Sequence, residues 1–115
     1  MPYVPVIAPR LGFVVLYRWR LHAGKEADFI AGWTRASERL RERGSLGSRL
    51  HRGSDGLWYS YAQWPDVATR ERAFAVPVAD DAMDMRMRAA IAERLPDVEL
   101  APVADHLVPA AIAAG

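Results

Sequence analysis

The alternation of apolar and polar residues is clearest between Asp55 and Pro65, where a turn sequence leads into an aromatic strand. Asp-Gly suits a tight turn with positive φ, whereas tryptophan, tyrosine and small residues suit a pleated strand. Side chains alternate between the two faces of a strand. One face then carries Trp58, Ser60, Ala62 and Trp64, and the other carries Tyr59, Tyr61 and Gln63. Neither face resembles a solvated one, so we expect both to be covered.

Similar patterns predict the remaining elements. Residues 12–21 are apolar on both sides and predict a central strand, and residues 46–52 predict a strand that pairs with the aromatic one. We expect a helix that Gly24 opens and Gly44 closes, a helix from Asp66 to Phe74, and a third that Asp80 and Asp81 start. The first would bury Phe29, Ile30, Trp33, Ala36, Ser37 and Leu40, and the third Met83, Met87, Ala90, Ile91 and Leu95. A final strand is expected at Val98–Val108, interrupted by Pro102.

The resulting order β-α-β-β-α-β predicts an α+β, ferredoxin-like fold: a four-stranded antiparallel sheet with helices on one face. Residues 1–115 form one domain, with an extended arm at 1–11 and a tail at 109–115. Because the central strands are apolar on both sides, we expect the face without helices to meet a second copy of the chain in a homodimer.

Composition narrows the classes of partner. The 15 basic and 14 acidic residues nearly cancel, so neither nucleic acid nor a membrane surface is an expected partner. The chain has no cysteine, which removes disulfides and thiolate chemistry. Three prolines and no basic region near the N-terminus argue against a secretory signal. We therefore expect a cytoplasmic protein.

No familiar catalytic or cofactor motif stands out. His22, His51 and His106 lie on separate segments, and the acidic residues at 80–84 are explained by a helix start, so no metal site is predicted. The glycines do not form a phosphate loop, and no Gly-x-Ser-x-Gly elbow occurs. An aromatic pocket for a planar ligand remains, with Ser60 and Trp64 on one strand face. Trp64 is equally compatible with a plain core position, and the face on which His51 lies is left open.

Three segments resemble a known family: residues 9–15, residues 50–56 and, above all, Tyr61-Ala62-Gln63-Trp64. They are similar to antibiotic biosynthesis monooxygenase domains, a family of dimeric α/β barrels, over about residues 9–108. Within that family the likeness is greatest to small cofactor-free enzymes that oxidise anthrones to quinones. The resemblance implies a small aromatic substrate, dioxygen as co-substrate, no cofactor and no metal.

The resemblance also implies roles for individual residues. His51 and Trp64 match the family's histidine and strand-end tryptophan, and Arg88 matches a helix arginine, with Arg86 as a rival. A histidine can move a proton, an arginine can hold a developing anion, and an indole can stack or donate a hydrogen bond. Ser60, Arg70 and Tyr17 are expected to bind the substrate.

Two positions depart from the family pattern. Ser60 stands where an asparagine is expected, and Arg70 where a tyrosine is expected on the following helix. These departures keep open an alternative: a non-catalytic or regulatory protein that binds a small molecule. Haem degradation, known on the same fold, is disfavoured because the chain has no asparagine and no histidine between His51 and His106.

Overall fold

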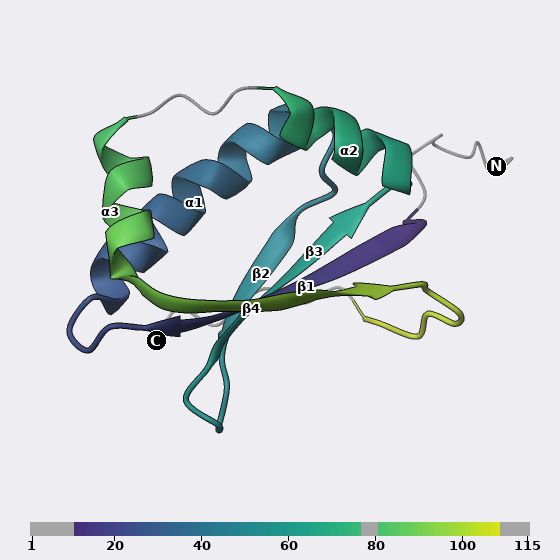
Figure 1. The fold of residues 1–115 in the computed structure, drawn as a ribbon. Helices are drawn as coiled ribbons and strands as arrows, with labels where there is room; N and C mark the ends of the chain where they lie inside the picture. The colour runs from purple at the N-terminus through teal and green to yellow at the C-terminus, as the bar shows by residue number, and fades with distance from the viewer. Residues whose placement is uncertain (1–10, 77–80, 109–115) are drawn as a thin grey trace, which may run out of the picture.

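A four-stranded antiparallel sheet carries three helices on one of its faces (Figure 1). The computed structural model describes residues 11–76 and 81–108. In chain order the elements are β1 (Phe13–Leu21), α1 (Glu26–Glu42), β2 (Ser48–Arg52), β3 (Trp58–Trp64), α2 (Val67–Ala75), α3 (Ala82–Ala90) and β4 (Ile91–Leu100). Asp80, the tail at 109–115 and the expected arm, apart from Leu11, lie outside the described residues.

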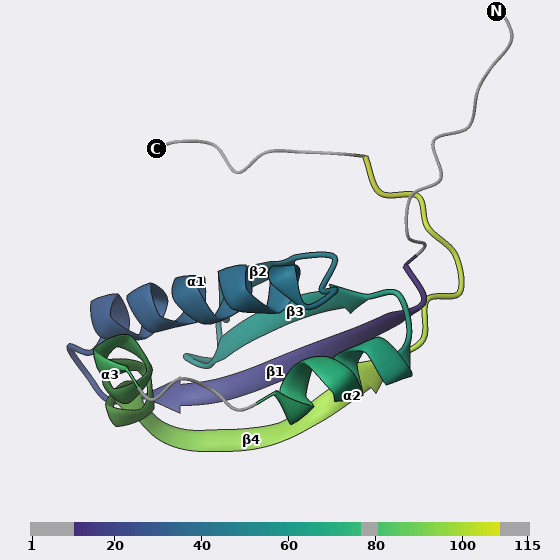
Figure 2. The ribbon, with the colours of Figure 1, turned by 90° about the horizontal axis from the view of Figure 1, so that it is seen from above.

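The strands lie in the order β2-β3-β1-β4, so β1 and β3 are central, as expected. Tyr17 pairs with Ser60 and Trp19 with Trp58 between β1 and β3. Seen from above, α1 runs along the β2–β3 half of the sheet, whereas α2 and α3 lie over the β1–β4 half (Figure 2). The predicted ferredoxin-like α+β fold is confirmed.

Strict alternation of side chains builds the core on the helix-covered face. Along β3, Trp58, Ser60, Ala62 and Trp64 are buried, whereas the residues between them are half-buried. Phe13, Val15, Tyr17 and Trp19 of β1 pack beside them and meet Phe29 of α1. The face assignment expected for the aromatic strand is therefore confirmed. No helix within residues 11–76 and 81–108 covers the opposite face, which we call the open face.

Helix α1 starts at Glu26, after an uncapped Lys25, and Gly44 follows its end in a left-handed conformation with φ of 105°. Phe29 and Gly32 are its buried residues. Ile30 was expected on the buried side but is 41% exposed, because it lies about 100° around the helix from Phe29. At Gly32 the helix crosses α3 so closely that a Cβ atom would collide with Cβ of Met87.

The C-terminal part of the chain differs from the expectation. Helix α3 ends at Ala90, and Ile91 and Leu95 belong to β4, which in turn stops at Leu100 rather than continuing to Val108. Pro96 disfavours a helix that runs through Leu95, because a proline restricts the residue before it, whereas it is tolerated on an edge strand. Strand β4 is such an edge strand.

Pro96 lies in an irregularity of the β1–β4 pairing. Leu16 faces Val98 and Arg18 faces Leu95, so two residues of β4, Pro96 and Asp97, stand opposite one of β1. This is a β-bulge. The side chain of Arg18 donates from Nε and Nη2 to the carbonyl oxygen of Pro96, at 3.1 and 2.9 Å. The guanidinium of Arg18 thus supplies hydrogen bonds to a carbonyl oxygen at the point where the strand pairing is interrupted.

Carboxylates cap the two short helices and join α3 to α1. The side chain of Asp66 accepts from the N–H of Thr69, and that of Asp81 from the N–H of Asp84. Asp81 and the buried Asp84 also form ion pairs with Arg39 of α1, the latter at 2.9 Å. Helix α3 is therefore held to α1 by charge at its start and by close packing at Gly32.

Candidate functional site

A cavity of about 230 Å³ lies between the helix-covered face of the sheet and the helices. Its walls are mostly aromatic and apolar, which suits a planar organic ligand. The aromatic lining residues are Tyr17, Trp19, Trp33 and Phe74, the hydroxyl-bearing ones are Ser37, Ser45, Ser48 and Ser60, and the cationic ones are Arg88 and Arg94. Among the described residues that line it there is no carboxylate and no histidine.

Ser60 lies at the centre of the cavity floor, where β3 pairs with β1. Its side chain is 2% exposed, and its Oγ accepts a hydrogen bond from Nε1 of Trp33 at 3.0 Å. Since that bond uses an acceptor site of the hydroxyl, the hydroxyl proton of Ser60 remains available to a ligand. Ser60 thus lines the cavity, where it was expected to lie. Nothing in the sequence indicated that Trp33 would be its hydrogen-bond partner.

Tyr17, opposite Ser60 on β1, also lines the cavity. Its oxygen accepts from Nε of Arg70 at 3.1 Å, and the guanidinium of Arg70 also lies over the rings of Tyr17 and Phe74. Burial raises the pKa of Tyr17, while the hydrogen bond from Arg70 opposes the shift. The phenol therefore stays protonated at neutral pH and can donate to a ligand.

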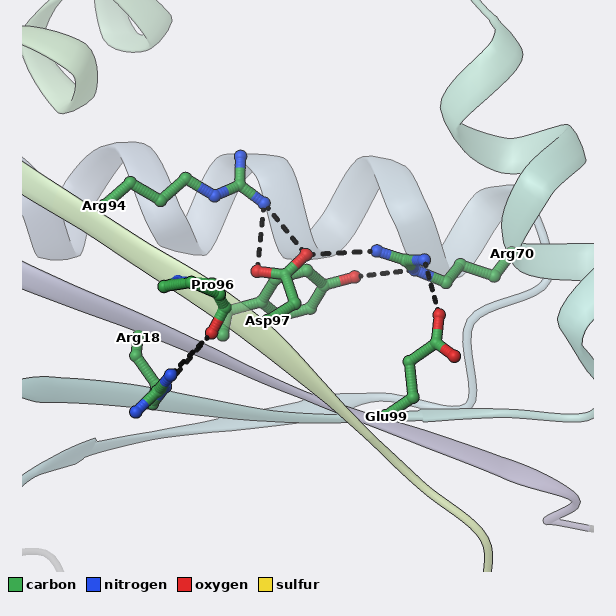
Figure 3. A network of polar contacts seen from close by, with 7 residues as sticks. Arg18, Arg70, Arg94, Pro96, Asp97 and Glu99 are labelled. Atoms are coloured by element: carbon green, nitrogen blue, oxygen red, sulfur yellow. Dashed lines mark hydrogen bonds and ion pairs between the residues drawn. The ribbon is translucent and has the colours of Figure 1, made fainter.

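Asp97, on the bulge of β4, holds the arginines next to Tyr17 (Figure 3). It accepts from Nη2 of Arg70 at 3.4 Å and from Nη2 of Arg94 at 3.2 Å, through both carboxylate oxygens in the second case. Glu99 lies 3.9 Å from Nη1 of Arg70. Arg70 contacts the cavity residue Tyr17 but is not itself among the lining residues, so it acts on the cavity through the phenol.

Trp64 does not line the cavity. It is fully buried behind Phe74, with ring centroids 6.1 Å apart, and Phe74 is the residue that meets the cavity. Its Nε1 has no hydrogen-bond partner among the described residues. Its complete burial behind Phe74 favours a core position for Trp64, and its expected catalytic role stays a prediction.

His51 lies on the opposite side of the sheet from the cavity. It pairs with Tyr59, and directly paired residues of antiparallel strands point to the same face. That face is the open one, because Ser60 and Trp58 occupy the other. His51, whose face the sequence left open, is not among the residues that line the cavity, and its expected catalytic role stays a prediction.

Arg88, in the last turn of α3, lines the cavity as expected, whereas its rival Arg86 is exposed elsewhere on the helix. Arg94 and Trp33 also line it, and sequence reasoning assigned them no functional role. Arg94 fell within a helix that was expected to continue to Leu95. Pro96 was the signal that could have ended that helix earlier and put Arg94 on a strand.

The described part of the chain lacks two further classes of feature. No group of three or more His, Cys, Asp or Glu residues there could hold a metal ion. No helix there combines the length and the apolar character needed to cross a bilayer.

Comparison with known proteins gives fold-level matches only. No family model and no curated protein sequence matches the chain. Among solved structures, the Streptomyces coelicolor monooxygenase from the gene ActVA-Orf6, in complex with nanaomycin D, is 22% identical, with a TM-score of 0.67 over 90% of this chain and 96% of that one. SnoaB, a cofactor-independent oxygenase from Streptomyces nogalater, is 19% identical, with a TM-score of 0.62 over 88% and 100%.

A protein from Bordetella bronchiseptica, provisionally named an antibiotic biosynthesis monooxygenase, is 21% identical, with a TM-score of 0.67 over 83% of this chain and 100% of that one. At these identities the comparisons establish the fold. They support the resemblance to the family seen in the sequence, and the chain has the fold of structures named antibiotic biosynthesis monooxygenases.

Proposed function

We propose that the protein is a cofactor-independent monooxygenase that oxidises a phenolic or anthrone-like aromatic to a quinone. In this reaction the substrate loses a proton from its reactive carbon, and the resulting carbanion forms a C–O bond with dioxygen. Loss of water from the peroxide leaves a carbonyl group. One CH₂ group and one O₂ thus become one C=O group and one H₂O, and the substrate supplies the electrons.

The observation that carries the proposal is the aromatic cavity with two hydroxyl donors on its floor. Tyr17 and Ser60 pair across the central strands, so both hydroxyls can reach one ligand. A hydrogen bond from either would stabilise the oxygen on which negative charge develops once the substrate is deprotonated. Arg88, at the rim, adds a cation that favours the same anion.

The base in this mechanism is not a histidine of the cavity. His51 lies on the other face, and no other histidine is among the described lining residues. Phenolic anthrones are acidic carbon acids, and nearby guanidiniums lower the pKa of such a group further. We propose that the proton passes to water at the mouth of the cavity.

Oxygen uptake and quinone absorbance with 1,8-dihydroxyanthrone test the proposal against an enzyme-free control. Tyr17→Phe keeps the ring and removes the donor, so we expect turnover to fall about 100- to 1000-fold. Tyr61→Phe, on the open face, is the matched control and should retain activity. No turnover by the wild type across a panel of phenols and anthrones would refute the oxygenase proposal.

A non-catalytic binding protein is the second candidate, and one observation favours it. Two of the three residues expected to do chemistry, His51 and Trp64, lie outside the cavity lining, whereas Arg88 is part of it. Saturable binding of aromatic ligands by calorimetry, without oxygen uptake for any of them, would establish this second function instead.

We also propose that two copies associate through the open face. Val98 and Leu100 of β4 are exposed there by 37% and 39%, and the segment after β4 exposes Val103 and Leu107 by 95% and 76%. Leu107, Val14 and Tyr61 line one shared groove, so the apolar segment is continuous with the open face. An apolar surface of this kind marks an interface.

Light scattering after size-exclusion chromatography tests the association. A dimer mass is expected for the wild type, and Leu100→Asp should shift it to a monomer because a carboxylate would be buried. Val67→Asp, at an exposed apolar position on α2, is the control. A monomeric wild type would contradict the proposal.

A further inference from the structure

A second hollow lies beside the cavity, between α1 and the edge strand β2, and we call it the edge groove. It has a volume of about 320 Å³, and its walls come from α1 and from the segment that leads into β2. Trp33, Ser37 and Ser48 line both the edge groove and the cavity. These residues therefore form the boundary between the two spaces.

Trp33 supplies most of that boundary. Ser37 and Ser48 are small, and their Oγ atoms lie 3.1 Å apart in a hydrogen bond. The half-buried indole of Trp33 is by far the largest of the three side chains. Its Nε1 donates to Oγ of Ser60 on the cavity floor at 3.0 Å, so the ring spans from α1 to the sheet. Turning the ring away would break this bond and leave a buried oxygen without its donor, which favours a fixed position for the indole.

The cavity alone is small. Its volume of about 230 Å³ lies below the range of roughly 300–1,000 Å³ that is typical of sites for drug-sized ligands. Loss of the indole would connect the cavity to the edge groove, because the same ring lines both. Trp33 therefore limits how far a planar ligand can extend toward β2.

We propose that Trp33 is a specificity-determining residue that sets the length of the aromatic ligand. Compact fused systems of up to three rings are accepted, and linear systems extended by a further ring are excluded. The inference rests on the proposed use of the cavity for an anthrone-like substrate, which has three fused rings, and it sets an upper limit to the size of that substrate.

Two quinones that differ by one fused ring test the inference: 1,4-dihydroxyanthraquinone and 6,11-dihydroxytetracene-5,12-dione. Quenching of tryptophan fluorescence measures their affinities in every variant, because Trp19 also lines the cavity. We expect the wild type to bind the three-ring quinone at least about tenfold more tightly, since the fourth ring overpacks the site. In Trp33→Ala the four-ring quinone should bind at least as tightly as the three-ring one, because the added ring is then buried in the joined space.

Two further variants complete the test. Trp33→Leu keeps a smaller apolar side chain on α1 and should give an intermediate preference. Thr34→Ala is the control, because Thr34 lines the edge groove but not the cavity, and it should keep the wild-type preference.

Three outcomes would overturn the inference: equal wild-type affinities for the two quinones, a preference that persists in both Trp33→Ala and Trp33→Leu, or a lost preference in Thr34→Ala. The quinones are already oxidised, so their binding is independent of turnover. A preference that depends on Trp33, without oxygen uptake on any anthrone, would refute the oxygenase proposal alone. Oxygen uptake together with equal quinone affinities would refute the length inference alone.

Discussion

Replacing Gly32 with alanine should destabilise the protein, although the same change stabilises most helices. Gly32 is buried in the middle of α1 where it crosses α3. A Cβ atom at this position would lie 2.9 Å from the carbonyl oxygen of Met83 and would collide with Cβ of Met87. Neither is the far end of a flexible side chain, so the two helix backbones must separate to accept it.

The expected magnitude follows from two opposing effects. Alanine is about 1 kcal/mol better than glycine inside a helix. Overpacking of a close contact costs about 1–3 kcal/mol. Taking the middle of that range, Gly32→Ala should lower the free energy of unfolding by about 1 kcal/mol, which lowers the melting temperature by about 4 °C in a domain of this size.

Urea denaturation followed by circular dichroism measures this change, and Ala27→Gly is the matched control. Ala27 is exposed in the first turn of the same helix, so its replacement should cost up to about 1 kcal/mol through helix propensity alone. If propensity governed both positions, the two substitutions would shift stability in opposite directions. A Gly32→Ala variant more stable than the wild type would refute the proposed close packing of α1 on α3.

Two further predictions concern single polar groups. Ser60→Ala removes the acceptor for Nε1 of Trp33 and should lower the free energy of unfolding, measured by urea denaturation, by about 1 kcal/mol. Ser54→Ala, in the exposed hairpin turn, is the control and should be neutral. Equal effects of the two substitutions would contradict the role of this hydrogen bond. The N–H of Asp84, with Arg39 and Arg35, lowers the pKa of Asp81 from 3.8 to about 2. The ionised carboxylate of Asp81 therefore stabilises the fold above about pH 4, and this contribution is lost as the pH falls through about 2. Asp81→Asn keeps an N-cap acceptor but not the charge, so its melting temperature should fall less than that of the wild type between pH 4 and pH 2; parallel curves for the two proteins would rule out this contribution.

The sheet could largely be predicted from local patterns. Asp55-Gly56 and the alternation that follows predict the hairpin and show which residues of β3 share a face, because side chains alternate along a strand. Asp66 also marks the start of α2 correctly, because a side-chain acceptor before a helix is a local signal.

The boundary between α3 and β4 could not be predicted in the same way. Met83, Met87, Ile91 and Leu95 repeat at helical spacing, so periodicity continues past the point where the helix ends at Ala90. Pairing with β1, a contact distant in sequence, decides that Ile91 begins a strand. Such tertiary contacts are absent from a short sequence window.

The candidate site was predicted in part for a similar reason. Ser60 and Tyr17 lie on strands whose faces the sequence specifies, and both reach the cavity. The side of the sheet on which His51 lies depends on the register between β2 and β3, which the sequence of β2 leaves open because its residues alternate weakly. Arg94 enters the site only because the chain becomes a strand after Ala90.

The bulge at Pro96 and Asp97 makes contacts with side chains on both faces of the sheet. On the open face, Arg18 donates hydrogen bonds to the carbonyl oxygen of Pro96. On the cavity side, the next residue, Asp97, accepts hydrogen bonds from Arg70 and Arg94 (Figure 3). The same short piece of backbone is therefore held by side-chain contacts on both faces of the sheet. The proposed association through the open face and the proposed ligand cavity therefore meet at two adjacent residues of one edge strand.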